Sequence, residues 1–331
     1  MKDFIDLFSG AGGLSLGLEA AGLNCVAAVE MNRDACETFA FRHRAASIHD
    51  VPIQQVDFSK YSGIPLVVGG PPCQPFSAGG KGLASGDTRD MIPQFVRAVK
   101  EARPDVFLME NVPGLAGPTH RAYLDHSLAK LSKLGYELVV EVLNAAEYGV
   151  PQKRRRLIVV GVRAGRAAFS IPAPTHGPRG HKAFLSAGSV LAGVKTSTSL
   201  NESKVTFAKR PDLRPSPYDG HLFNGGGRAI DLSAPSHTIL ASAGGNKTHF
   251  LDLDGEVPAY HQHLLRGGQP KVGSLQGGRR LSVEESAALQ TFPKAMKFAG
   301  SRSSQYAQIG NAVPPGLGKV LGKALVENLK S

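Results

Sequence analysis

The chain contains no tryptophan and only three cysteines among its 331 residues. Three cysteines without a Cys-x-x-Cys pair are too few for a disulfide framework or a structural zinc site. No apolar run approaches the roughly 18 residues of a membrane-spanning helix, and the first residues show no signal-peptide pattern. We therefore expect a protein of the cytoplasm that binds no metal, has no contact with a membrane and folds around an ordinary hydrophobic core.

Acidic residues are also scarce, with 27 Asp and Glu against 38 Lys and Arg, which gives a net charge of +11. The stretch 175–280 alone has 13 basic and 7 acidic residues and so carries +6 of this charge. No Lys/Arg-rich tail is present, so any basic surface must belong to the fold. A balance of this size indicates a polyanion as partner, usually nucleic acid. A basic enzyme without such a partner is the alternative.

Strand and helix patterns alternate through the first half of the chain. This alternation predicts an α/β fold with a doubly wound, mostly parallel sheet. Strands are expected at 3–8, 25–30, 47–50, 64–68, 105–110, 137–143 and 157–162, and helices at 13–22, 32–43, 89–103 and 123–134.

From about residue 173 the composition shifts towards Gly, Pro, Ser and Thr, and the periodicity weakens. We expect 1–172 to form a catalytic and cofactor-binding domain, and 173–300 to form a second, smaller, loop-rich domain with its hinge. Helical patterns return at 283–289 and 316–329, so 301–331 is expected to complete the first domain, with a turn before the last helix.

The segment DLFSGAGG joins the end of a strand to a glycine-rich turn and the start of a helix. Gly10, Gly12 and Gly13 would let backbone amides approach a ligand at the helix N-terminus. Glu30 ends the next strand, where ribose hydroxyls are held in such folds, and Asp50 ends the third, where it could accept from an adenine amino group. S-adenosylmethionine fits this pattern, but a dinucleotide or a simple tight turn also fits it.

Two further strand ends carry reactive side chains. In GGPPCQPFS, Cys73 follows a buried strand at the edge of the sheet where ligands bind. A free cysteine is as often a small buried hydrophobe, so position alone leaves both roles open. In MENVPG, Glu110 ends a strand in apolar surroundings, where burial raises the pKa of a carboxyl group and suits it to proton donation. A surface acid or helix cap is the alternative for Glu110.

Two polar features lie later in the chain. In QKRRR, strand alternation would send Arg154 and Arg156 to one side and Arg155 to the other. Two adjacent guanidinium groups suit a clamp for an anion or a base edge, although a charge run is usually a solvated face. In QIGNAVPP, Asn311 is flanked by apolar residues, which suggests that its amide binds a loop or a ligand.

The residues of these motifs and their order along the chain resemble those of the DNA (cytosine-5) methyltransferase family across nearly the whole chain. DLFSGAGG, GGPPCQPFS, ENV, QKRRR, RRLSVEESAALQTFP and QIGNAVPP follow one another in family order. The resemblance implies a bacterial, restriction-modification type of enzyme with a Rossmann-like methyltransferase domain and a target-recognition domain. It also implies methyl transfer from S-adenosylmethionine to C5 of a flipped-out cytosine in duplex DNA, with S-adenosylhomocysteine as product.

The resemblance assigns roles to individual residues. Cys73 would add as a thiolate to cytosine C6, Glu110 would hold N3 as a protonated donor, and Arg156 with Arg154 would bind the base edge and a phosphate. The cofactor residues implied are Phe8, Gly10, Gly12, Gly13, Leu14, Glu30, Met31, Asp50, Val51, Pro72, Asn311 and Val313.

Residues of the variable part would read the target. Thr238-Ile239 matches a pair that the family places between two recognition loops, with the threonine near a phosphate. FNGGGR and SAGGNK flank it, and they offer Asn224, Arg228, Asn246 and Lys247 as donors for base edges. Flexible hairpin tips that bind only phosphate are the alternative. Double-stranded DNA is the expected partner of a monomer associated with the nucleoid, and a restriction endonuclease for the same site is a further partner that the resemblance suggests.

The chain departs from the family at two places. Met31 stands where some members have tryptophan, and Gly79, six places after the nucleophile, cannot fill the space left by a flipped base. A tRNA-methylating branch remains an alternative, although its Cys-Phe-Thr signature is missing because no cysteine follows Cys73. An inactive DNA-binding homologue should have lost Cys73 or Glu110. The nucleophile loop disfavours a Rossmann oxidoreductase.

Overall fold

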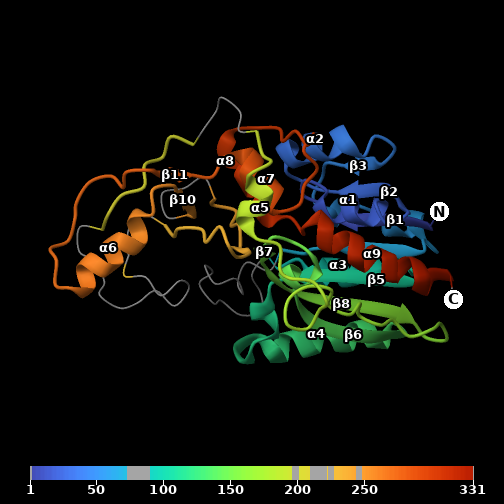
Figure 1. Cartoon of the computed structure of the whole chain (residues 1–331). Helices are drawn as coiled ribbons and strands as arrows, with labels where there is room; N and C mark the ends of the chain where they lie inside the picture. Colours follow the sequence, from blue (N-terminus) through green and yellow to red (C-terminus); the bar gives the residue numbers. More distant parts are fainter. Residues whose placement is uncertain are drawn as a thin grey trace.

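The computed structural model describes residues 2–72, 90–195, 201–208, 222, 227–243 and 248–330. Its centre is a seven-stranded sheet with the strand order β3-β2-β1-β4-β5-β8-β6 (Figure 1). The predicted α/β sheet is thereby confirmed. Its strands are β1 (Lys2–Leu7), β2 (Leu23–Val29), β3 (Ser47–His49), β4 (Leu66–Gly69), β5 (Val106–Asn111), β6 (Tyr136–Asn144) and β8 (Arg155–Arg163).

The first five strands of the sheet pair in parallel. Strand β8 alone runs antiparallel to its neighbours β5 and β6, so the sheet is mostly parallel, as predicted. The strand order reverses at β1, which has β2 on one side and β4 on the other. Ligands of open α/β sheets bind beyond the carboxyl ends of strands at such a reversal, which here brings together the loops after β1 and β4.

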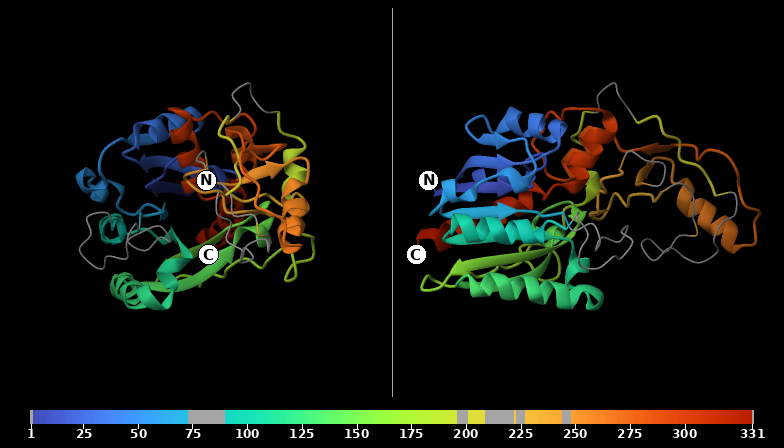
Figure 2. Two further views of the ribbon diagram at one scale, coloured as in Figure 1. Left: turned by 90° about the vertical axis from the view of Figure 1, so that its left-hand side faces the viewer. Right: turned by 180° about the vertical axis from the view of Figure 1, so that it is seen from behind.

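Helices cover both faces of the sheet. One face packs against α1, α2 and α9, and the other against α3, α4 and three short 3₁₀ helices. The helices α1 and α9 face the viewer in Figure 1, and α3 does so in the rear view of Figure 2. Strand residues such as Phe4 and Ile5 point to opposite faces and are both buried, which explains the nearly continuous apolar runs of these strands. The bounds are α1 (Gly13–Glu19), α2 (Arg33–Arg42), η1 (Ile53–Gln55), η2 (Phe58–Tyr61), α3 (Ile92–Ala102), η4 (Pro113–Ala116), η5 (Pro118–His120), α4 (Arg121–Lys133), η6 (Ala145–Tyr148) and α9 (Pro315–Lys330).

A smaller apolar cluster lies away from the sheet, around α6 and β10, and includes Phe250, Val257 and Tyr260. Figures 1 and 2 place α6, β10 and β11 at one end of the molecule and both chain ends at the other. The division of the chain at residue 173 stays a prediction. The remaining elements of the described chain are β7 (Gln152–Lys153), α5 (Ala187–Leu191), β9 (Ser236–His237), β10 (Phe250–Asp252), α6 (Glu256–Leu265), β11 (Gly278–Arg280), α7 (Val283–Leu289) and α8 (Arg302–Asn311).

One element differs from the sequence-based expectation. The turn expected before the last helix is in fact the end of α8, whose final residue is Asn311. The Ser301 side chain caps this helix by accepting from the Ser304 amide, but its sequence RSSQYAQIGN has too few apolar positions to reveal the period. No helix in the described ranges is long and apolar enough to cross a membrane.

Candidate active site

A cleft of about 1420 Å³ opens at the carboxyl edge of the sheet. It is bounded by the loops after β1, β2 and β4, by the end of β5 and by the end of α8. The structure thus brings together most of the residues singled out from the sequence. Those that line it are Phe8, Gly10, Gly13, Leu14, Glu30, Met31, Val51, Pro72, Glu110, Arg156, Asn311 and Val313.

Glu30 shapes the glycine-rich loop at this cleft. Its Oε2 accepts a hydrogen bond of 2.9 Å from the Gly10 amide, and its Oε1 accepts from the amides of Met31 (2.9 Å) and Asn32 (2.8 Å). Gly10 and Gly12 adopt left-handed backbone angles, φ 53° and 78°, which an L side chain rarely adopts. The carboxylate therefore holds the loop in place, a role that the sequence pattern did not predict.

Two of the expected cofactor residues do not line the cleft. A Cβ on Gly12 would come within 2.6 Å of the His43 ring and 2.8 Å of Phe39, so Gly12 allows close packing against α2. Asp50 is exposed and is not among the residues that line the cleft, whereas its neighbour Val51 is. A cofactor role for Asp50 stays a prediction.

Asp6 is a residue of the cleft to which the sequence interpretation gave no role. It is 1% exposed, and its Oδ2 accepts a 2.6 Å hydrogen bond from the Ser15 hydroxyl. The pKa of the Asp6 carboxyl is raised to about 7, mainly by burial; the Ser15 bond lowers it in part, and the nearby carboxylates of Glu30 and Glu19 add to the rise. Its place among the apolar residues that form the second half of β1 was the available signal.

Glu110 and Arg156 form an ion pair at the wall of the cleft. Arg156 Nε lies 2.7 Å from Glu110 Oε1, with side-chain exposures of 12% and 10% respectively. The antiparallel register pairs Asn111 with Leu157 and so places the start of β8 beside the end of β5. This register explains why the Arg156 and Glu110 side chains lie within contact distance. Burial lowers the pKa of the Arg156 guanidinium, and Glu110 partly offsets this effect. The two side chains are thus paired with each other at the cleft.

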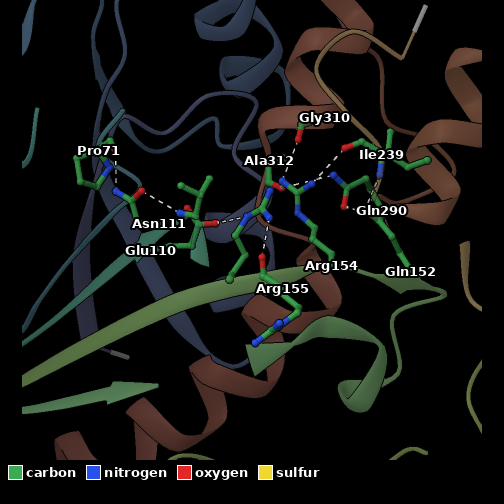
Figure 3. Close-up of polar contacts among 12 residues, drawn as sticks. Pro71, Glu110, Asn111, Gln152, Arg154, Arg155, Ile239, Gln290, Gly310 and Ala312 are labelled. Atoms are coloured by element: carbon green, nitrogen blue, oxygen red, sulfur yellow. Dashed lines mark hydrogen bonds and ion pairs between the residues drawn. The ribbon is translucent and has the colours of Figure 1, made fainter. Parts of the chain in front are cut away.

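Asn111 ties the end of β5 to the loop after β4. Its Nδ2 donates a 3.0 Å hydrogen bond to the Pro71 carbonyl (Figure 3). The Met91 amide donates to the Pro72 carbonyl at 3.1 Å. Cys73 itself lies outside the described residues, and so does Gly79. The residues immediately before Cys73 are therefore anchored at the cleft. The sequence motif ENV contained Asn111, but the interpretation gave it no role.

Arg154 is placed differently from the expectation that it would lie beside Arg156 at a base edge. It is fully buried and donates to the carbonyls of Ile239, Gly310 and Ala312 (Figure 3). Strand alternation fails here because the chain passes from β7 to β8 at Arg154, and these strands belong to different sheets. Burial lowers the pKa of its guanidinium well below the usual value. The structure therefore separates Arg154 from the cleft.

The residues expected to read DNA are described only in part. Thr238 is half-buried and its hydroxyl donates to the Lys153 carbonyl at 2.8 Å. Arg228 is half-buried, and its carbonyl accepts from the Phe250 amide at the start of β10. A phosphate contact for Thr238 and a base-reading role for Arg228 both stay predictions. The other three candidates lie outside the described residues, namely Asn224, Asn246 and Lys247.

The described side chains include no group of three or more His, Cys, Asp or Glu that could hold a metal ion. The chemistry that this part of the chain offers is instead a carboxylate at the glycine-rich loop and an Arg–Glu pair beside an anchored loop.

Comparison with known proteins identifies the family. A family model described as C-5 cytosine-specific DNA methylase matches residues 2–327. The Type II methyltransferase M.PspPI of Psychrobacter sp. (strain TA137) is 35% identical over 338 residues, covering 99% of this chain and 79% of that protein. The Type II methyltransferase M.NgoMIV of Neisseria gonorrhoeae is 29% identical over 334 residues, covering 98% and 97%.

A solved structure shares the fold. A mutant of Spodoptera frugiperda DNMT2 superposes with a TM-score of 0.72 at 19% identity, covering 98% of this chain and 100% of that one. At this identity the likeness concerns the fold alone. The family match over almost the whole length decides the activity: this chain belongs to the C-5 cytosine-specific DNA methylase family and is a DNA (cytosine-5) methyltransferase.

Proposed function

We propose that the chain uses S-adenosylmethionine as methyl donor and acts on a flipped-out cytosine in duplex DNA through a covalent bond from Cys73 to C6. The observation that carries this proposal is the single cleft that joins the glycine-rich loop to the Glu110–Arg156 pair. One cavity would thus hold a nucleoside cofactor at the glycine-rich loop and a base at the Glu110–Arg156 pair, next to each other.

The donors of the cleft fit S-adenosylmethionine. Glu30 Oε2 accepts one backbone hydrogen bond, which leaves acceptor capacity for a ribose hydroxyl. Met31 is 70% exposed and lines the same cleft as Val51 and Ile53, so an apolar surface is available to an adenine ring. When bound, the cofactor supplies a methyl group on a sulfonium, a strong electrophile. The chain's own task there is to orient it and exclude water.

Glu110 and Arg156 suit the recognition of a cytosine. A guanidinium donates to the base carbonyl, and a protonated carboxyl group donates to N3. Because each already contacts the other at 2.7 Å, little side-chain entropy is lost when the base enters. Donation to N3 favours the adduct over the free base, since nucleophilic addition to C6 raises electron density at N3 and C5.

The thiol is the remaining group of this proposal. Cys25 and Cys36 are 2% and 8% exposed, and burial raises the pKa of both thiols, so neither supplies a thiolate at neutral pH. The Cys73 thiolate would add to C6, and the ring electron pair at C5 would take the methyl group as its bond to the sulfonium sulfur breaks, which releases S-adenosylhomocysteine. Loss of the C5 proton to a base and departure of the Cys73 thiolate would then restore the aromatic ring and the free enzyme.

The recognition part would supply target selection. Thr238 would lie near a phosphate and Arg228 near a base edge, as the family order of loops suggests, and the basic balance of 175–280 would offset part of the cost of flipping. We further propose a monomer that modifies the same site as a cognate restriction endonuclease.

Bisulfite sequencing tests the proposed function. Plasmid isolated from cells that express the wild-type chain should carry 5-methylcytosine at one recurring sequence, and plasmid from cells with Cys73→Ala should carry none. Labelled S-adenosylmethionine with either duplex DNA or tRNA separates the two substrates. Label in tRNA alone, or methylation retained in Cys73→Ala, would contradict the proposal.

A further inference from the structure

A network of fully buried polar side chains connects two distant parts of the chain. Gln152, Arg154 and Gln290 are each 0% exposed. They lie between residues 238–241, which we term the recognition segment, and residues 310–313, which we term the cofactor wall because all four line the cleft. Figure 3 shows the Arg154 guanidinium close to Ile239, Gly310 and Ala312, with Gln290 and Gln152 beside Ile239.

A single guanidinium contacts both segments. Arg154 Nη1 donates to the Ile239 carbonyl at 3.2 Å. Arg154 Nη2 donates to the carbonyls of Gly310 (2.9 Å) and Ala312 (2.8 Å). The recognition segment and the cofactor wall therefore share one rigid, planar donor.

The two glutamines reinforce this connection. Gln152 Oε1 accepts from the Ile239 amide at 2.9 Å, and its Nε2 donates to Gln290 Oε1 at 3.1 Å. Gln290 Nε2 in turn donates to the Ile309 carbonyl at 2.6 Å. Both backbone polar groups of Ile239 are thus held by side chains of this network, which fixes its position against α8.

The two segments also touch directly. A Cβ on Gly310 would come within 2.2 Å of the Leu240 carbonyl carbon and 2.3 Å of the Ala241 nitrogen, so only glycine permits this approach. The Thr238 hydroxyl bonds to the Lys153 carbonyl at 2.8 Å, on the residue before Arg154. A shift of the recognition segment must therefore be accommodated by the cofactor wall.

The charge of Arg154 is costly at this position. Its hydrogen-bond partners are carbonyl groups, and its Nε has no partner among the described residues. A buried charge of this kind stabilises less than a well-packed apolar side chain of similar volume. Its directed bonds, however, define the relative position of two segments, which an apolar side chain cannot do. This favours a role in alignment over a role in stability.

We propose that Arg154 is a positioning residue that couples the recognition segment to the cofactor wall. DNA held at Thr238 orders the backbone at Gly310 and Ala312, and cofactor binding becomes tighter. The inference rests on the proposed function, because it takes Thr238 to face DNA and residues 310–313 to face the cofactor. The coupling is reciprocal, so the cofactor strengthens DNA binding by the same factor.

Calorimetry on the full chain tests the coupling. The dissociation constant of S-adenosylhomocysteine is measured with and without a duplex that carries the site mapped by bisulfite sequencing. The ratio of the two constants should be at least about fivefold in the wild type. It should fall to about one in Arg154→Met, because both sets of carbonyls are released. Arg154→Lys keeps the charge but loses the planar fork, so its ratio should be intermediate.

Arg155→Met is the matched control, since it removes the same charge from the adjacent, exposed position and should keep the wild-type ratio. The ratio divides out any loss of cofactor-only affinity, so a general loss of stability does not change it. If Arg154→Met folds and its ratio of dissociation constants equals that of the wild type, the inference is overturned. If Arg154→Met does not fold, a wild-type ratio in Arg154→Lys overturns it instead. A ratio of one in the wild type overturns it too. Absence of either ligand's binding to the wild type would instead refute the proposed function, and this inference with it.

Discussion

Asp6→Asn tests the electrostatics at the base of the cleft. The ordinary pKa of the Asp6 carboxyl is 3.8 and burial raises it to about 7 in the folded protein. The folded state therefore binds a proton more tightly than the unfolded state, and this contribution to stability is fully present below about pH 4 and is lost as the pH rises to about 7. Each pH unit between these values costs about 1.4 kcal/mol, so the total approaches about 4 kcal/mol.

The asparagine variant has no such titration. Its stability relative to the wild type should therefore increase by about 3 kcal/mol between about pH 5 and pH 8. Any constant cost of burying the new amide group cancels in that comparison. Urea unfolding of both proteins at several pH values measures the difference, with Asp3→Asn on the same strand as a control for the lost charge. A difference between Asp6→Asn and wild type that does not change with pH would refute the reasoning.

Three further substitutions probe the cleft and the recognition part. Glu30→Ala should weaken S-adenosylhomocysteine binding about tenfold or more, because three backbone amides lose their acceptor. Calorimetry beside the exposed control Glu37→Ala measures this, and equal affinities would remove Glu30 from the cofactor site. Asn111→Ala releases the Pro71 carbonyl and should lower kcat more than DNA affinity, so an unchanged kcat would contradict its anchoring role. Arg228→Ala should relax discrimination at one base position by about 1–3 kcal/mol, as judged from methylation rates on singly substituted sites. Uniform weakening on every site would indicate a phosphate contact instead.

The sequence predicted the sheet well because its strands are buried on both faces and appear as short apolar runs, such as Leu66–Gly69. It also placed Glu30 and Glu110 correctly at strand ends, since the carboxyl ends of parallel strands meet at one edge. The prediction failed where contacts between distant parts of the chain determine the position of a side chain. The change of sheet at Arg154 breaks the two-residue alternation, and nothing local in the sequence reveals that its partners lie at Ile239 and Gly310.

The sequence also did not predict the polar contacts within the cleft. The bonds of Glu30 to the backbone and of Asn111 to Pro71 depend on which loops are neighbours in the sheet order. A sequence pattern gives the residue type and the strand end, but it does not give the partner. The end of α8 was missed for a related reason, because its helix is stabilised by packing and a cap more than by an apolar stripe.

The central claim is a covalent bond between Cys73 and the target base, and trapping this bond tests it most directly. A duplex with 5-fluorocytosine at the mapped site, incubated with the chain and S-adenosylmethionine, should give a stable protein–DNA complex because fluorine cannot leave as a proton does. Peptide mapping by mass spectrometry should locate the nucleotide on Cys73, and Cys73→Ala should form no complex. A complex attached at another residue, or turnover without any adduct, would contradict the account.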